Sequence, residues 1–350
     1  MSLRRQPPVR WLLLAAIVLA ALVLSACGEN LPATTTYPEG THARRIYELL
    51  VPIFWVALGV FVVVEGMLVY SVVRFRQRPD SGIPTQIHGN TTIEIAWTIA
   101  PALILLVIAV LTFRTQAIQS VQPPNALKIQ VIGHQWWWEF RYPDQNVVTA
   151  GDLYIPVGQD ITLELMSNDV IHSFWMPKLA GKTDAVPGHT NLLSFQAEQP
   201  GIYRGLCAEF CGEEHAVMRF RIVTVPPDVF QNWVAQHAAA PPPPPENVRQ
   251  IFTQKACVGC HSISGFQEAV GKVGPNLTYF GSRETIAGGA LPNTPDNLRL
   301  WLQDPGAVKP GNTMATTIGP GKVMLTPDEI NTLIAYLEGM KVQIAKPAVR

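Results

Sequence analysis

The chain has 350 residues, enough for two or three domains, and its five cysteines are an odd number, which argues against a framework of disulfides alone. Its 26 basic and 26 acidic residues give a formal net charge of zero, so nothing in the charge indicates a nucleic-acid partner. Only 15% of the residues are charged and the mean hydropathy is positive, which favours a protein with a membrane component.

The N-terminal segment has the pattern of a secretory signal. Arg4, Arg5 and Arg10 precede the apolar run WLLLAAIVLAALVLS, which ends in LSAC. LSAC resembles the bacterial lipoprotein box, in which the cysteine is lipidated and becomes the first residue. We therefore expect a signal peptide of the lipoprotein type over residues 1–26 and lipidation of Cys27. An ordinary signal peptide or a first membrane helix is the alternative.

Residues 45–115 are expected to form a two-helix transmembrane hairpin. Two apolar segments, 49–73 and 93–113, are each long enough to cross ~30 Å of hydrocarbon as a helix. The loop between them contains three arginines, Arg74, Arg76 and Arg78. By the positive-inside rule this loop is cytoplasmic, so both ends of the hairpin lie outside the cell membrane.

The pattern changes to short apolar or alternating runs over residues 125–226. Examples are LKIQVIGHQWWWEF, ITLELMSN and MRFRIVTV, and turn signals such as Pro143-Asp144 and Pro200-Gly201 separate the runs. Several short strands at this spacing predict an all-β sandwich or barrel of roughly 100 residues.

Residues 227–245 are expected to link this region to the next. The stretch PPDVFQNWVAQHAAA predicts a short helix, and the five prolines that follow it predict a semi-rigid polyproline II spacer.

Helix signals dominate residues 246–342, where we expect a small all-α domain. TPDNLRLWLQDP has Thr294 as the expected N-cap, with proline at the first helical position. TPDEINTLIAYLEGM pairs Thr326 with Glu329 as a capping box.

The stretch CAEFCGEEHAVM, residues 207–218, brings two cysteines, a histidine and a methionine together, and IHSFWMP supplies a second histidine. Zinc takes Cys or His ligands and has no use for methionine, whereas soft sulfur mixed with imidazole suits copper. A mononuclear blue-copper site needs one cysteine, so we interpret the two thiolates as bridges between two copper ions. A disulfide and a zinc site are the alternatives. The expected ligands are His172, Cys207, Cys211, His215 and Met218.

This loop resembles the dinuclear copper A loop of subunit II of haem-copper cytochrome c oxidases. GHQWWWEFRYPD resembles the aromatic segment of that subunit, and HSFWMPKLAGKTDAVPGH resembles its first copper-ligand segment. The resemblance covers roughly residues 45–225 and implies a cupredoxin-like Greek-key sandwich for the β-region. It also implies that Cys207 and Cys211 bridge the coppers, that His172 and His215 bind one copper each, and that Met218 is an axial ligand.

The resemblance assigns three further residues. The carbonyl of Glu209 is the second axial ligand, and its carboxylate reaches a magnesium or manganese ion at the interface with subunit I. Trp136 is the residue through which electrons enter, and Glu94 lies at the cytoplasmic mouth of a proton path. The alternatives are an exposed carboxylate for Glu209, core packing for Trp136, and a capping box of Glu94 with Thr91.

CVGCH, residues 257–261, is the attachment signature of a c-type haem. Its spacing lets Cys257 and Cys260 add to the haem vinyl groups while His261 takes one axial position of the iron. The second axial ligand is expected to be Met314 in VKPGNTM, although proline usually follows this methionine in the family and alanine stands here. Met324 is the alternative ligand.

Together these features predict subunit II of a terminal respiratory cytochrome c oxidase with a fused C-terminal cytochrome c domain. Electrons would pass from haem c to copper A and on to the oxygen-reducing, proton-translocating subunit I. The expected partners are subunits I and III, an upstream electron donor and membrane lipid, with no nucleic acid. The expected location is the bacterial cell membrane, multi-pass, with both cofactor domains on the outer face. A copper A nitric oxide reductase subunit and a copper-delivery lipoprotein are the competing hypotheses.

Overall fold

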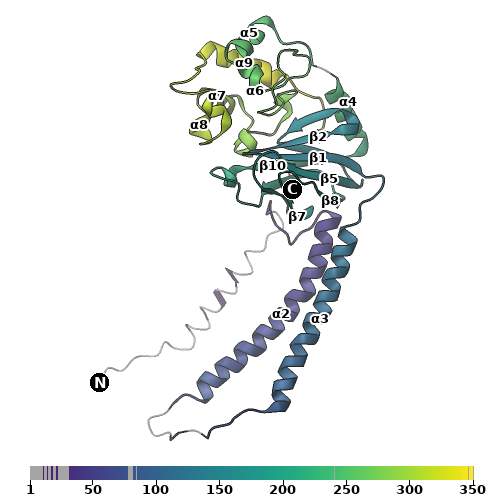
Figure 1. The fold of residues 1–350 in the computed structure, drawn as a ribbon, viewed down its shortest axis with the longest axis vertical. Helices are drawn as coiled ribbons and strands as arrows, with labels where there is room; N and C mark the ends of the chain where they lie inside the picture. Colours follow the sequence, from purple (N-terminus) through teal and green to yellow (C-terminus); the bar gives the residue numbers. More distant parts are fainter. Residues whose placement is uncertain are drawn as a thin grey trace, which may run out of the picture.

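The computed structural model describes residues 31–77, 82–83, 85–239, 241–345 and 347–349, together with residues 11, 14, 17, 18, 21 and 22 (Figure 1). Cys27 and most of the predicted signal peptide lie outside the described residues, as does Arg78. Lipidation and signal cleavage therefore remain predictions.

Two long helices, α2 (Thr41–Arg74) and α3 (Thr91–Gln119), run side by side away from the rest of the chain (Figure 1). Both are long and apolar enough to cross a membrane. Their 34 and 29 residues span about 51 and about 44 Å at 1.5 Å per residue, so both extend beyond the ~30 Å hydrocarbon layer. The Ala43 N–H donates to the Leu179 carbonyl (3.1 Å), which ties the start of α2 to the β-region.

The cap at the start of α3 differs from the predicted box. Asn90 is the N-cap, and its side chain accepts the Ile93 N–H (3.2 Å). The Glu94 carboxylate accepts the Asn90 N–H (3.2 Å) instead of forming a box with Thr91. An asparagine side chain accepts the free N–H groups of a first helical turn as well as a threonine side chain does. With Asn90 as the N-cap, α3 begins one residue earlier than it would with Thr91 as the N-cap.

Ten strands form two sheets of five, which pack face to face as a sandwich. Their orders are β3-β2-β1-β5-β8 and β4-β10-β9-β6-β7. The parallel pairs β1·β5 and β4·β10 combine with antiparallel neighbours. The strands are β1 (Leu127–His134), β2 (Trp137–Tyr142), β3 (Val147–Ala150), β4 (Asp152–Pro156), β5 (Ile161–Ser167), β6 (His172–Met176), β7 (Ala180–Ala185), β8 (Asn191–Phe195), β9 (Gly201–Cys207) and β10 (Arg219–Val225).

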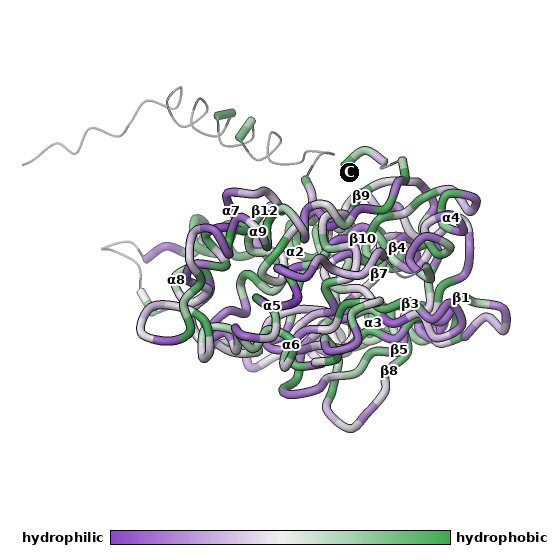
Figure 2. The backbone as a smooth tube through the Cα atoms, turned by 90° about the horizontal axis from the view of Figure 1, so that it is seen from above, coloured by the Kyte–Doolittle hydropathy of each residue, from purple (hydrophilic) through white to green (hydrophobic). Residues whose placement is uncertain are grey.

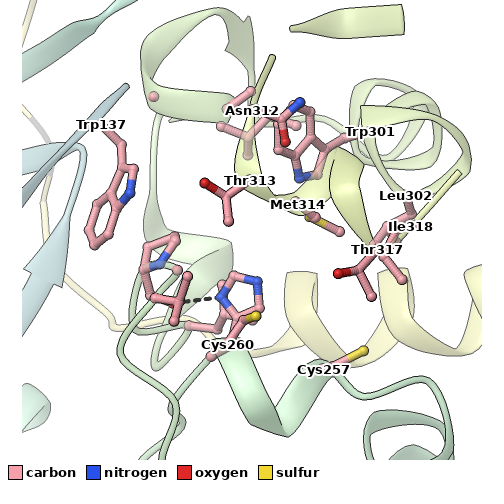
Figure 3. A pocket seen from close by; sticks show the side chains of 18 of the residues that line it. Trp137, Cys257, Cys260, Trp301, Leu302, Asn312, Thr313, Met314, Thr317 and Ile318 are labelled. Atoms are coloured by element: carbon pink, nitrogen blue, oxygen red, sulfur yellow. Dashed lines mark hydrogen bonds between the residues drawn. The ribbon is translucent and has the colours of Figure 1, made fainter. Parts of the chain in front are cut away.

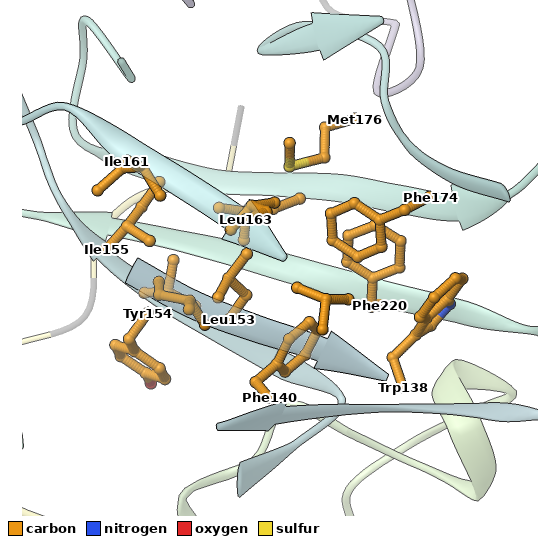
Figure 4. Packing of buried hydrophobic residues seen from close by; sticks show 14 of the residues in the cluster. Trp138, Phe140, Leu153, Tyr154, Ile155, Ile161, Leu163, Phe174, Met176 and Phe220 are labelled. Atoms are coloured by element: carbon orange, nitrogen blue, oxygen red, sulfur yellow. The ribbon is translucent and has the colours of Figure 1, made fainter. Parts of the chain in front are cut away.

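Aromatic rings and aliphatic side chains together fill the sandwich core (Figure 4). Phe174 and Phe220 stack with their centroids 4.0 Å apart, and Trp138 meets Phe174 edge-on at 5.0 Å. These fully buried side chains come from strands of both sheets, so they join the two layers.

The C-terminal third is helical, as predicted, and has a second hydrophobic core of its own. Thr294 accepts the Asn297 N–H as the N-cap of α7, and Thr326 and Glu329 form the capping box of α9, which confirms both predicted caps. The helices are α4 (Pro227–Ala238), α5 (Glu246–Gln254), α6 (Cys257–Cys260), α7 (Pro295–Gln303), α8 (Pro305–Val308) and α9 (Pro327–Gly339).

The helical region sits on the sandwich, on the side away from the hairpin (Figure 1). Viewed from above, α5, α7 and α8 gather on one side and strands β3, β4 and β9 on the other (Figure 2). After α9 the chain returns to the sandwich: Val342 joins its core, and the Ile202 N–H donates to the Ala348 carbonyl (2.9 Å). The helical region is therefore attached to the sandwich at both of its ends, and the proline spacer is only one of the two connections.

Candidate functional site

Five sulfur and imidazole side chains meet at one end of the sandwich. Cys207 ends β9 and His172 begins β6, while Cys211, His215 and Met218 follow on the loop between β9 and β10. The Cys207 and Cys211 sulfurs lie 3.8 Å apart. The Nδ1 atoms of His172 and His215 lie 3.9 Å from Cys207 Sγ and 3.6 Å from Cys211 Sγ, respectively.

Two weaker donors also lie close to the sulfurs. Met218 Sδ lies 3.7 Å from Cys211 Sγ, and the Glu209 carbonyl oxygen lies 3.2 Å from Cys207 Sγ. Each sulfur therefore faces one imidazole, and each has one weak axial donor nearby. This is the symmetry that two metal ions sharing two bridges require.

The donor set fits copper better than a disulfide or zinc. A sulfur separation of 3.8 Å is far above the ~2.05 Å of a disulfide bond, and both cysteines are free. A tetrahedral zinc ion would leave the thioether and the carbonyl unused. A hydrogen bond from Cys211, together with His172, holds the pKa of Cys207 well below its usual range, so one thiolate is already available for a metal.

Asp169 orients one of the histidines and was not predicted from the sequence. Its Oδ1 lies 2.8 Å from His172 Nε2, which leaves Nδ1 facing Cys207. The same carboxylate accepts the backbone N–H groups of Gln135 (2.6 Å) and Val170 (2.7 Å). Against the effect of partial burial, these hydrogen bonds lower the pKa of Asp169. An acid three residues before a ligand histidine was the available signal.

The three consecutive tryptophans have three different settings. Trp138 packs in the core, edge-on to His172 at 5.7 Å. Trp137 stacks on His134 with the ring planes 5° apart. The indole N–H of Trp136 donates to the Cys211 carbonyl (2.9 Å), and Gln135 Nε2 donates to the same oxygen (2.7 Å). Trp136 thus contacts the backbone of a predicted copper ligand.

A cavity in the helical region brings the predicted haem residues together (Figure 3). Cys257, Cys260 and His261 line it, and so does Met314. His261 Nδ1 lies 2.8 Å from the Pro275 carbonyl, so Nε2 is the nitrogen left for an iron ion. Met324 does not line the cavity and is 63% exposed. The placement favours Met314 over Met324.

The lining of this cavity fits a porphyrin. Most of its wall is apolar, which suits a flat hydrophobic cofactor, and two unpaired thiols lie at one edge. The apolar part of the wall includes Phe252, Leu298, Trp301, Leu302 and Leu333.

One wall of the cavity belongs to the sandwich. Trp136 and Trp137 line it beside Lys309 of the helical region. Burial lowers the pKa of Lys309 to about 8, while the charges of Glu214 and Cys211 act in the opposite direction. Trp136 therefore contacts both the haem cavity and the backbone of Cys211.

Known protein families match three regions of the chain. Family models match residues 38–115 (cytochrome c oxidase subunit II, transmembrane domain), 148–225 (its periplasmic domain) and 245–341 (cytochrome c). Cytochrome c oxidase subunit 2 of Alkalihalophilus pseudofirmus is 37% identical over 332 residues, which cover 92% of this chain and 94% of the relative. The chain belongs to the cytochrome c oxidase subunit 2 family.

Other members agree over nearly the full length. The subunit 2 proteins of Bacillus sp. PS3 and Bacillus subtilis are 35% and 32% identical, each covering 95% of this chain and 98% of the relative. The crystal structure of the periplasmic domain of subunit II from Bradyrhizobium japonicum has 31% identity and a TM-score of 0.33, covering 33% of this chain and 96% of its own.

Membership in the cytochrome c oxidase subunit 2 family confirms the resemblance seen in the sequence and the fold class, a helical hairpin, a cupredoxin-like sandwich and a cytochrome c domain. The family implies copper A, and the cytochrome c match implies haem. As a subunit of a terminal oxidase, the chain is part of an oxidoreductase.

The side chains of the remaining predicted residues, Glu94 and Glu209, do not take part in the cluster. Glu94 lies at the start of α3, at the far end of the hairpin from the sandwich (Figure 1). The Glu209 side chain is exposed on the loop of residues 207–218, here called the copper loop, next to Phe210, which is 76% exposed.

Proposed function

We propose that this chain is the subunit through which electrons enter a terminal respiratory cytochrome c oxidase. Electrons pass from haem c to the dinuclear copper A centre and on to the oxygen-reducing, proton-translocating subunit I. One observation carries the proposal: Trp136 lines the haem cavity and also donates a hydrogen bond to the carbonyl of Cys211. A single residue therefore connects the two predicted cofactor sites.

The residues that would hold each group follow from the geometry. Cys257 and Cys260 would attach the haem, with His261 and Met314 as its axial ligands. The copper pair would be held by His172, Cys207, Cys211, His215, Met218 and the Glu209 carbonyl. When bound, each group would carry one electron at a time, and no bond in a substrate would be made or broken.

The protein contributes a rigid, dry setting for the copper ligands. Cys207, Cys211 and Met218 are at most 3% exposed, and His172 is fully buried. Asp169 fixes the orientation of His172, and Gln135 and Trp136 fix the loop at Cys211. Ligands that cannot move keep the same geometry in both oxidation states, which lowers the reorganisation that accompanies each electron transfer.

The finer partner assignments are part of the same proposal. Subunit I would cover the exposed copper loop, where the Glu209 carboxylate would reach a magnesium or manganese ion. Subunit III, an upstream donor and membrane lipid are the other expected partners. The cofactor domains would lie on the outer face of a bacterial cell membrane, because the arginine-containing loop is cytoplasmic.

Glu94, in the first turn of α3, would admit protons at the end of the hairpin that the positive-inside rule makes cytoplasmic. Glu94→Ala should slow turnover and leave both metal spectra unchanged. Unaffected turnover would leave only its contact with the Asn90 N–H as a role for this residue.

A copper A nitric oxide reductase subunit is the second candidate, because the catalytic identity resides in the partner subunit. A copper-delivery lipoprotein would not need the haem cavity. Purification of the native complex and measurement of the gas it consumes test these hypotheses. Oxygen consumption that depends on both haem c and copper is the expected result, whereas reduction of nitric oxide without oxygen consumption would overturn the proposal.

A further inference from the structure

Lys309 is a buried lysine at the boundary between the cytochrome c domain and the copper domain. It is 2% exposed, and its ammonium donates to the Trp136 carbonyl (2.7 Å) and to the Ala287 carbonyl (2.9 Å). Trp136 belongs to the sandwich and Ala287 to the helical region. A lysine is almost never fully buried unless its charge is paired or hydrogen-bonded, so this arrangement needs a reason.

The carbonyl that Lys309 holds belongs to the residue that contacts the copper loop. Trp136 accepts a hydrogen bond from Lys309 at its carbonyl and donates one to Cys211 from its indole. A single chain of hydrogen bonds thus runs from the cytochrome c domain through Trp136 to a predicted copper ligand. Moving the ammonium would release the backbone of Trp136 and, with it, the position of the indole.

The surface around Lys309 is shaped for close approach of backbone. Gly288 and Gly311 have φ values of +68° and +72°, which disfavour any side chain. A Cβ atom on Gly288 would overlap the Trp136 carbonyl and lie 2.9 Å from the Lys309 ammonium. A Cβ atom on Gly311 would lie 2.7 Å from the Glu213 carboxylate. At these two glycines the helical region therefore approaches Trp136 and Glu213 of the sandwich closely.

A separate set of contacts holds the domains together elsewhere. The Asp152 carboxylate of β4 accepts the Glu284 N–H (3.0 Å), and Arg221 of β10 lies 3.6 Å from the Glu284 carboxylate. The segment after α9 adds a further attachment through Ala348 and Ile202. Because these contacts do not involve Lys309, loss of its ammonium should leave the domains attached.

We infer that Lys309 is a positioning residue, whose buried ammonium holds Trp136 between the haem cavity and the copper loop and thereby sets the rate of electron transfer between the two centres. This inference rests on the proposed function. Lys309 lines the haem cavity but supplies no predicted metal ligand, and its hydrogen bond to the Trp136 carbonyl is the contact through which it positions that residue.

The test is Lys309→Met in the complete oxidase complex, with Lys341→Met at an exposed position of the same domain as the control. A photoexcited ruthenium complex reduces haem c, and its reoxidation is followed together with the reduction of the copper band. The expected result is a fall of about tenfold or more in the haem-to-copper rate of Lys309→Met. Because Lys309 lines the haem cavity, the spectra of both centres and the bimolecular reduction of haem c are recorded for each variant. A slower haem-to-copper step in complexes that retain both metal spectra separates positioning from general loss of structure.

A second pair of variants keeps the inference testable if Lys309→Met does not assemble. Gly288→Ala inserts a methyl group between Trp136 and Lys309 without removing the charge. Gly321→Ala is its control, because Gly321 has φ +74° and a Cβ atom there would meet nothing within 4 Å. Gly288→Ala should slow the same step and Gly321→Ala should not.

An unchanged haem-to-copper rate in Lys309→Met, with both spectra intact, would overturn the role of Lys309. If Lys309→Met does not assemble, equal haem-to-copper rates in Gly288→Ala and Gly321→Ala would also overturn the role of Lys309. Absence of any haem-to-copper transfer in the unmodified complex would instead refute the proposed function, so the two failures are distinguishable.

Discussion

The two predicted cofactor sites are built in different ways. The copper donors come from the ends of two neighbouring strands and one short loop, and they contact one another directly. The haem cavity is lined by residues that range from Phe252 to Leu337, together with Trp136 and Trp137 of the sandwich. The first site is local and fixed by the sheet, whereas the second is non-local and shared between two domains.

This contrast predicts that the haem cavity depends on the sandwich, whereas the copper site does not depend on the helical region. A site whose ligands are positioned by strands should keep its geometry when the neighbouring domain is altered. A cavity that borrows a wall from the sandwich should be sensitive to changes at the boundary. The following variants test that difference, beginning with the largest expected effect.

Cys207→Ser should abolish the near-infrared band and the mixed-valence signal of the copper centre, because a hydroxyl group is a poor bridge between copper ions. The haem c spectrum should remain, since none of the haem residues contacts Cys207. Optical and paramagnetic resonance spectra of isolated membranes provide the measurement. Persistence of the copper signals would refute the copper assignment.

Met314→Ala should convert low-spin haem c to a form with a weak or altered sixth ligand and leave the copper signals unchanged. Met324→Ala is the matched control and should have no spectral effect, because its side chain is exposed. Visible absorption of the reduced protein provides the measurement. The opposite pattern would assign the iron ligand to Met324.

Trp138→Ala should destabilise the copper domain by about 3–5 kcal/mol, because a fully buried ring in contact with Phe174 and Phe220 is lost. Urea unfolding followed at the copper absorption measures the change. A loss below about 1 kcal/mol would mean that the surrounding rings collapse into the space.

Asp152→Asn should flatten the dependence of stability on pH. Burial raises the pKa of Asp152 to about 6, and the charges that act on it are those of Glu284, Arg221 and Arg283. A raised folded-state pKa gives a stabilising contribution that is complete below the unfolded-state pKa and is lost as the pH rises through about 6.

Asparagine keeps an acceptor for the Glu284 N–H but does not titrate. The variant should therefore lose less stability than the natural chain between about pH 4 and pH 7, by at most about 3 kcal/mol. Thermal unfolding across this range is the measurement, and parallel curves for the two chains would contradict the explanation.

The sequence predicts the parts of the structure that depend on neighbouring residues. The caps at Thr294 and Thr326 were predicted because a cap is defined within four residues. The meeting of the five sulfur and imidazole side chains was predictable because four of them lie within a dozen residues and have unusual chemistry. The capping box of Thr91 with Glu94, the alternative role for Glu94, does not form, because Asn90 is also a good cap and lies one residue earlier.

The parts that the sequence did not predict depend on distant contacts. Lys309 meets Trp136 across 173 residues, and no local pattern links the two. The chain that follows α9 returns to the sandwich at Ile202, and no local pattern predicts this contact either. Asp169 is close to His172 in sequence, but its role depends on how the turn before β6 folds. Non-local packing, rather than residue type, determines all three.

The central claim is that Cys207 and Cys211 together hold a pair of copper ions. Metal analysis of the purified complex, combined with paramagnetic resonance, tests it most directly. After the copper of subunit I is subtracted, two copper ions should remain for each copy of this chain, with one unpaired electron shared between them. One zinc ion at this position, or a disulfide between the two cysteines, would contradict the claim.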